Sequence, residues 1–370
     1  MFRKILTAVT LILVALVVWS ARNEVLEAIT YLANTNIWFI ILLIPEQLFM
    51  YYCAGQIFFS YMAAKKDAKK ISNWTLMRIS FELNFVNNAV PSGGFSGLGY
   101  IAWRLAPYGS SAGQTSFMYI LRYVITILAN QTQTMVAILA LVLMGTVPTE
   151  NRYMLWLVAI ICTAVVIVMA IMVVIVGNKK RIDWFANIVT KFVNFLVRKI
   201  TFGHKKKVLK DMVVRKYCME LHAAFLEAKE HKNILKAPII WGVVYSFLEV
   251  ATYWLVAISM GHPEFLPQIM VAEAIGSIFG AILPTPGGAG GYEASMAGVM
   301  WALGVDLGLA TAVVVTTRVI VLIGTIASGY GFYQHAISKL NKKEIKEIKE
   351  TEKVEEAEEA EEIRDTKEDE

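Results

Sequence analysis

Two proline–glycine segments interrupt apolar, helix-forming stretches and limit the possible folds of this chain more than any other feature. They are Pro91–Gly94 and Pro284–Gly288. Each segment is followed by a single arginine inside a later apolar stretch. Arg122 lies 31 residues after Pro91, and Arg318 lies 34 residues after Pro284. A helix can break at membrane depth only where protein or a watery cavity satisfies the freed backbone groups. Two such breaks at matching positions predict an internal repeat with a binding site at its centre.

The composition places the chain in a membrane. Of its 370 residues, 56% are hydrophobic, and the mean hydropathy is +0.53. Both values are typical of an all-α polytopic membrane protein. We predict about six full transmembrane helices plus two re-entrant broken-helix hairpins. The expected spans are residues 5–21, 37–62, 79–106 (broken), 114–146, 153–176, 237–259, 268–303 (broken) and 308–337.

The first span resembles a signal peptide, because Arg3 and Lys4 precede an apolar run. Trp19, however, stands where signal cleavage requires a small residue. We therefore interpret residues 5–21 as the first membrane helix. The span 114–146 is longer than a bilayer requires, and its middle, Asn130–Thr134, is polar. Either this helix extends out of the membrane, or its polar patch faces a cavity.

Basic connections predict the topology, because Lys and Arg accumulate in cytoplasmic loops. The loop 65–70 is basic, and the connection 177–236 holds 15 Lys and Arg against 5 Asp and Glu. Three other connections carry almost no net positive charge and are expected outside, namely 22–36, 147–152 and 260–267. Both termini are then cytoplasmic. In this scheme the hairpin 79–106 enters from the inside and the hairpin 268–303 from the outside.

Other landmarks recur in the same order. In the first half Glu46 and Glu82 precede the break and Arg122 follows it; in the second half the corresponding residues are Glu249, Glu273 and Arg318. With the opposed hairpins, this order predicts an inverted-topology repeat. We divide the chain into a transmembrane domain, 1–337, and a charged cytoplasmic tail, 338–370. Within the domain, repeat one covers about 37–146, repeat two about 237–337, and a basic cytoplasmic amphipathic insert covers 177–236.

The insert and the tail have different characters. In the insert, apolar and aromatic side chains such as Trp184 and Phe195 recur between basic ones, which suits a helix on an anionic membrane surface. Ordinary positive-inside topology would also explain the basic charge. The tail carries 14 acidic and 8 basic residues, a net charge of −6. We expect it to be a solvated, charged segment without chemistry of its own.

Glu293 and Arg318 are the strongest candidates for a substrate-binding site. An ionisable group at bilayer depth costs about 2.5–3.5 kcal/mol and therefore needs a partner or a function. Glu293 opens the helix after the second break, where free N–H groups attract a carboxylate or a phosphate. Arg318 can offer its guanidinium to a lipid phosphate or to Glu293. The alternative is a permanent structural ion pair.

The remaining candidates are residues of the two breaks and charged groups near them. Glycines permit close backbone approach and positive φ. The further candidate substrate-binding residues are Gly287, Gly288, Gly291, Arg122, Ser92, Gly93 and Gly94. The possible charge partners are Glu46, Glu249, Glu82 and Glu273. Glu46 follows Pro45 and could simply lie at a kink, and Glu82 and Glu273 could lie near opposite interfaces. Arg104, just after the first hairpin, could extend to the interface.

Several functions are not supported by the sequence. The five histidines and three cysteines, Cys53, Cys162 and Cys218, show no ligand spacing, so we expect no metal, no cofactor and no disulfide framework. There is no Walker motif, and thus no ATPase in this chain. No soluble domain suggests nucleic-acid binding. We accordingly expect no enzyme.

The two breaks, AVPSGGFSG and ILPTPGGAGGYEAS, and the spacing of Glu293 and Arg318 resemble the lysylphosphatidylglycerol synthase transmembrane family, also called the flippase-like domain family. The resemblance covers essentially 1–337. Many relatives carry an acidic residue soon after the first SGG, where this chain has Phe95–Gly97. The family implies a cell-membrane domain that moves phospholipids between leaflets. Its best-known members are implied to move aminoacylated phosphatidylglycerol, which lowers the negative surface charge and gives resistance to cationic peptides. In these two-part members a separate C-terminal synthase domain takes lysine from charged tRNA. Only 33 residues follow Ile337, so we expect the flippase-like domain without the synthase.

These observations favour translocation of an anionic or aminoacylated phospholipid of the phosphatidylglycerol type. A second hypothesis is a membrane partner for a lipid-modifying synthase on a separate chain, acting in phosphatidylglycerol lysyltransferase chemistry. A third is a small-solute transporter. Expected partners are phospholipid, such a synthase, and a second copy in a homo-oligomer, but no nucleic acid.

Overall fold

The computed structural model describes residues 29–31, 35–63, 71–89, 95–200, 211–282, 285 and 288–338. These residues form helices and connections without a strand, and the predicted all-α polytopic fold is confirmed. Five helices are long and apolar enough to cross a membrane, namely α3 (Ile37–Ala63), α6 (Ala112–Met144), α7 (Tyr153–Val176), α10 (Asn233–Ser259) and α13 (Leu307–Ser338). The predicted span 5–21, the loop 65–70 and the tail after Ser338 lie outside the described residues.

The two broken spans form two pairs of short helices. The first pair is α4 (Asn73–Ala89) and α5 (Phe95–Leu105), and the second is α11 (Leu266–Ile282) and α12 (Gly291–Ala302). At 1.5 Å per residue, α5 and α12 are only about 16–18 Å long, so neither can cross a hydrocarbon core of about 30 Å. In each pair the two helices contact each other. Each pair is therefore a hairpin within the bundle.

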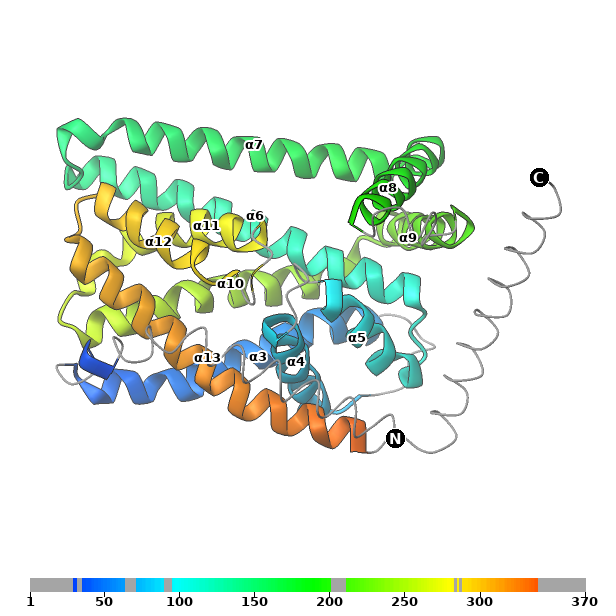
Figure 1. Cartoon of the computed structure of the whole chain (residues 1–370), viewed down its shortest axis with the longest axis horizontal. Helices are drawn as coiled ribbons and strands as arrows, with labels where there is room; N and C mark the ends of the chain where they lie inside the picture. The colour runs from blue at the N-terminus through cyan, green and yellow to red at the C-terminus, as the bar shows by residue number, and fades with distance from the viewer. Residues whose placement is uncertain are drawn as a thin grey trace.

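The two hairpins occupy opposite halves of the bundle (Figure 1). In that view α11 and α12 lie to the left, where α6 ends and α13 begins, whereas α4 and α5 lie to the right, on the side of α8 and α9. The long helices reverse in the same way: α3 and α10 run in opposite directions, and so do α6 and α13. This is the geometry that an inverted-topology repeat requires.

Helices of the two halves pack against each other reciprocally. α3 and α10 form the most extensive contact, α6 packs on α11, and α13 packs on α4. Small residues allow close contact between α13 and α4 and also between α10 and α6. A Cβ at Gly329 of α13 would lie 2.6 Å from the Cβ of Phe85 in α4, and one at Gly242 of α10 would collide with Ile125 of α6. Such close backbone approach is typical of helix contacts in membranes.

Local signals explain where several elements begin and end. Ser111 caps α6 through the backbone N–H of Gln114, whose side chain bonds Ser111 in return. Gly145 ends α6 with a φ of +65°, which glycine adopts without strain. Three short 3₁₀ turns complete the connections, namely η1 (Ala106–Tyr108), η2 (Thr149–Asn151) and η3 (Pro263–Phe265).

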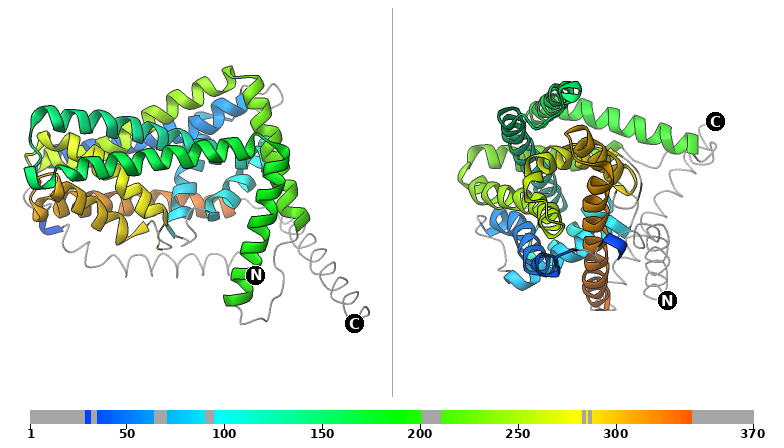
Figure 2. Two further views of the ribbon diagram at one scale, coloured as in Figure 1. Left: turned by 90° about the horizontal axis from the view of Figure 1, so that it is seen from above. Right: turned by 90° about the vertical axis from the view of Figure 1, so that its left-hand side faces the viewer.

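The basic insert forms α8 (Lys179–Ile200) and α9 (Asp211–Glu230) at one end of the bundle. Figure 2 shows that α8 runs crosswise to α7, at the end of the bundle. Ile182 and Ala186 are buried, whereas Trp184 and Phe195 are exposed. Hence α8 has an apolar face without a protein partner among the described residues, and it runs crosswise to a membrane-spanning helix. This orientation suits a helix lying in the membrane interface.

Candidate functional site

Glu293 and Arg318, predicted to act together, meet in the structure. The Nε of Arg318 in α13 donates to Oε1 of Glu293 at 2.8 Å. The other carboxylate oxygen accepts from the backbone N–H of Gly290 at 2.7 Å, so Glu293 also caps the first turn of α12. The Arg318 side chain is 26% exposed and that of Glu293 18%. The pair therefore ties the second hairpin to the last helix and is still accessible from outside the protein.

Two tyrosines extend this site. The guanidinium carbon of Arg318 lies 4.6 Å from the ring centroid of Tyr292, which precedes Glu293. Tyr292 in turn stacks on Tyr253 of α10, with ring centroids 6.2 Å apart. A cation over an aromatic face is held by the ring quadrupole. Arg318 thus contacts both a carboxylate and an aromatic ring, and it could exchange the carboxylate for another anion without leaving the ring.

The glycines of the second break have distinct roles. Gly288 has a φ of +72°, and a Cβ there would lie 2.5 Å from the Cα of Gly280 in α11. Gly290 has a φ of +87° with open space beside it. Gly291 is the first residue of α12. Gly287 lies outside the described residues. Gly288, at the described end of the break, is therefore pressed against the backbone of α11.

The first break has no equivalent pair among the described residues. Ser92, Gly93 and Gly94 lie outside them. Arg122 has its guanidinium 5.1 Å from the ring centroid of Tyr245 in α10. Within the described part of the chain, no carboxylate oxygen lies within 4.0 Å of Arg122, although the charge of Glu249 attracts it. Arg122 is therefore a half-buried cation that lies over an aromatic ring.

Glu46 and Glu249 come from the paired helices α3 and α10. Glu46 accepts hydrogen bonds from Gln47 at 2.9 Å and from Thr252 of α10 at 3.2 Å. It follows Pro45 within a continuous helix, so the position of the proline is compatible with α3. The two carboxylates are near enough to repel each other. No cation within ion-pair distance is present for either of them in the described residues.

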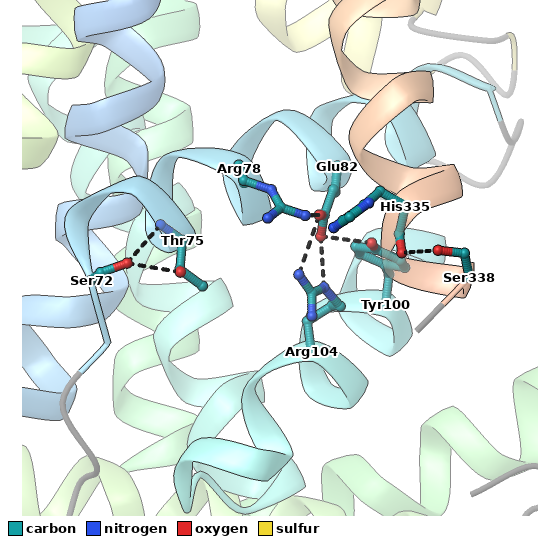
Figure 3. A network of polar contacts seen from close by, with 8 residues as sticks. All are labelled: Ser72, Thr75, Arg78, Glu82, Tyr100, Arg104, His335 and Ser338. Carbon is teal, nitrogen blue, oxygen red and sulfur yellow. Dashed lines mark hydrogen bonds and ion pairs between the residues drawn. The ribbon is translucent and has the colours of Figure 1, made fainter. Parts of the chain in front are cut away.

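Glu82 is the centre of a separate network in the first hairpin (Figure 3). Its carboxylate accepts from Arg104 of α5 at 2.6 and 3.2 Å and from Tyr100 at 2.8 Å, and Arg78 lies at 3.8 Å. The Glu82 side chain is fully buried. Two arginines and a tyrosine therefore compensate the charge of Glu82 inside the protein, and this carboxylate does not depend on a position at the membrane interface. Arg104 likewise pairs within the protein and does not extend to the interface. This network holds α4 to α5.

Glu273 has a different environment. It is 3% exposed, and its Oε2 accepts a hydrogen bond of 2.8 Å from Asn130 of α6. Asn130 also accepts from Ser246 of α10, which accepts from Gln133 of α6 at 2.7 Å. Asn130, Gln133 and Thr134 of the polar patch are therefore buried against α10 and α11, whereas Thr132 is exposed. Sequence reasoning noticed this patch but not its partner.

Among the described residues, no group of three His, Cys, Asp or Glu side chains could hold a metal ion. The three cysteines are free. Opposed long helices, two short hairpins and ionised groups held between them define the class of this molecule: it is an all-α, multi-pass membrane protein.

Comparison with known families then identifies its family. The sequence model of the lysylphosphatidylglycerol synthase TM region matches residues 5–329, and the chain belongs to that family. The resemblance found in the sequence is confirmed. The family implies a membrane domain associated with lysylphosphatidylglycerol synthesis or flipping. No curated protein and no solved structure matches the chain.

Proposed function

We propose that this protein moves an anionic or aminoacylated phospholipid of the phosphatidylglycerol type between the leaflets of the cell membrane. The observation that carries the proposal is the accessible pair of Glu293 and Arg318 at the tip of a broken helix. A phospholipid headgroup needs a binding site for its phosphate inside the bilayer. An arginine beside the free N–H groups of a helix N-terminus is such a site.

Arg318 would exchange partners during transport. Without lipid it pairs with Glu293, and a lipid phosphate would replace this carboxylate while the guanidinium stays on Tyr292. Glu293 would then remain as the cap of α12 through Gly290. Return of the carboxylate to Arg318 would expel the phosphate, because two anions compete for one guanidinium fork. The pair thus binds and releases the lipid without a covalent step.

Arg122 would supply a second phosphate contact. It has no carboxylate within ion-pair distance among the described residues, so a ligand anion would meet a cation that is not neutralised by direct contact. The glycine-rich breaks at Ser92, Gly93 and Gly94 and at Gly287, Gly288 and Gly291 would let the headgroup approach the backbone. The basic insert and the positive-inside rule support cytoplasmic termini.

The test is transbilayer movement of labelled phosphatidylglycerol in liposomes that contain the purified protein. We expect wild type to move the lipid and Arg318→Ala and Glu293→Gln to lose most of that movement. Arg152→Ala and Glu264→Gln are matched controls, because both residues are exposed in connections between helices. All variants must elute as the wild type does in size-exclusion chromatography. Movement that survives both site substitutions would refute the proposed site.

Two other functions predict different results. A membrane partner for a separate lipid-modifying synthase is favoured by the description of the family, and it predicts movement, or lipid modification, only after the synthase is added. Such a protein would contribute to cationic-peptide resistance through lysylphosphatidylglycerol. A small-solute transporter predicts uptake of a solute and no lipid movement. Failure of wild type with several anionic and aminoacylated lipids would favour these alternatives.

A further inference from the structure

The centre of the bundle holds more carboxylates than arginines. Leaving aside the separate Glu82 network, the charged side chains described there are Glu46, Glu249, Glu273, Glu293, Arg122 and Arg318. If all of them were ionised, this region would carry two uncompensated negative charges. A carboxylate removed from water without a cation is strongly destabilised and takes up a proton instead. At least one of these carboxylates is therefore expected to bind a proton.

Glu273 is the carboxylate with the least compensation. Glu293 pairs with Arg318, Glu249 is attracted by Arg122, and Glu46 accepts two hydrogen bonds and is only half-buried. Glu273 is 3% exposed and, among the described residues, accepts one hydrogen bond, from the neutral amide of Asn130. No Lys, Arg or His nitrogen lies within 4.0 Å of it among the described residues.

The helices packed against α11 add no positive charge at this position. From α10, Glu249 repels Glu273, and Tyr253 is close enough to interact with it. From α12 the group that faces it is Tyr292, and from α6 it is Asn130. Glu264 of η3 is exposed and pairs with His262. Among the described residues, the titratable groups that act on Glu273 from these helices are thus one carboxylate and two tyrosines.

The hydrogen-bond chain at Glu273 connects both halves of the protein. Gln133 donates to Ser246, Ser246 donates to Asn130, and Asn130 donates to Glu273, so the chain passes from α6 to α10, returns to α6 and ends in α11. The carbonyl oxygen of Gln133 is buried and has no hydrogen-bond partner among the described residues. An ionised carboxylate accepts a stronger hydrogen bond than a neutral carboxylic acid. The proton on Glu273 therefore changes the strength of the contact between α6 and α11.

We propose that Glu273 is a proton-binding site that couples lipid movement to a proton gradient. In the observed arrangement Glu273 is a neutral carboxylic acid. When the contact between α6 and α11 opens, its O–H bond breaks and the proton passes to water on one side. In a second arrangement, open to the other side of the membrane, the carboxylate takes a proton from water on that side. No electron is transferred, and the gradient supplies the free energy. This coupling rests on the proposed function.

The protonation state can be measured without any lipid transport. In infrared difference spectra of the purified protein between acidic and alkaline pH, a protonated carboxylic acid gives a carbonyl band. We expect such a band at neutral pH that is lost in Glu273→Gln but kept in Glu264→Gln, Glu249→Gln and Glu46→Gln. A band that is instead lost in Glu249→Gln or Glu46→Gln, or the absence of any band at neutral pH, would overturn the assignment.

Coupling is tested in liposomes with a pH difference of one unit and the membrane potential clamped to zero. We expect the initial rates of labelled phosphatidylglycerol movement in the two gradient directions to differ in wild type, by about tenfold at most for one proton. In Glu273→Gln the two rates should be equal. A directional difference that persists in Glu273→Gln overturns the coupling. If wild type moves no lipid, the coupling fails together with the proposed function, whereas the infrared band still decides whether Glu273 holds a proton.

Discussion

A series of glycine-to-alanine substitutions separates two reasons for glycine at the second break, namely the positive φ and the close approach to α11. Gly288 has a φ of +72°, and its Cβ would lie 2.5 Å from the Cα and 2.7 Å from the carbonyl oxygen of Gly280. Gly290 has a φ of +87° but no heavy atom within 4 Å of the added Cβ. Gly298, inside α12, has open space and no positive φ. Alanine at Gly288 would therefore meet both backbone strain and a collision, alanine at Gly290 would meet backbone strain alone, and alanine at Gly298 would meet neither.

The expected losses of stability follow from these geometries. At Gly290, alanine would have to adopt a positive φ with a ψ of −54°, outside the left-handed helical region, which costs about 1–3 kcal/mol. At Gly288 the same strain is joined by a collision with backbone, and overpacking adds about 1–3 kcal/mol. At Gly298, alanine should stabilise the helix by about 0.5–1 kcal/mol. We thus expect the order of stability Gly298→Ala, wild type, Gly290→Ala and Gly288→Ala.

The assay is thermal unfolding in one detergent, followed by tryptophan fluorescence and by the fraction that remains monodisperse. Only the order of the melting temperatures is required, so incomplete reversibility does not prevent the comparison. If Gly288→Ala melts no lower than Gly290→Ala, the close approach of the turn to α11 is wrong. If both variants melt as wild type does, the positive φ angles at Gly288 and Gly290 are wrong.

Three further predictions concern the helix contacts. Glu82→Gln should lower the free energy of unfolding by about 3 kcal/mol in chemical denaturation, because it leaves two arginines beside a neutral, buried group; an effect equal to that of a surface substitution would refute this. Gly329→Ala should destabilise by about 1–3 kcal/mol and Gly331→Ala should not, because only the first meets α4; equal melting temperatures would contradict the packing. The hydrogen bond from Arg215 lowers the pKa of Asp183 in the folded protein. The contact therefore stabilises the packing of α8 on α9 at every pH above the ordinary aspartate pKa of about 3.9. This stabilisation is lost as the pH falls through the lower pKa of the folded protein. Near-ultraviolet circular dichroism should show that loss in wild type but not in Asp183→Asn.

Much of the fold follows from local patterns. Apolar runs of bilayer length locate α3, α6, α7, α10 and α13 to within about four residues at either end, because a membrane helix satisfies its own backbone. Proline and glycine locate both breaks for the same reason. The partner of Glu293 was also predictable, since a carboxylate and an arginine at membrane depth have few alternatives.

The other partners were not predictable, because they depend on which helices meet. Asn130 and Glu273 are 143 residues apart, and their contact exists only because α6 packs on α11. Glu82 and Arg104 belong to the same hairpin, but nothing in their spacing distinguishes a buried pair from two groups at an interface. Polar patches reveal that a partner is needed but do not identify it.

The two halves of the protein share a packing scheme but not the same electrostatics. In the second half a carboxylate at the start of α12 neutralises Arg318. In the first half α5 begins with Phe95, Ser96 and Gly97, so it offers no carboxylate at the corresponding place, and Arg122 contacts Tyr245 instead. An anion that approaches Arg318 must displace Glu293, whereas one that approaches Arg122 displaces no directly bound carboxylate among the described residues. If lipid phosphate visits both arginines, Arg122 should therefore bind it more tightly and Arg318 release it more readily. In the proposed transport, two halves that differ in this way would bind the phosphate with different strengths at the two ends of its path.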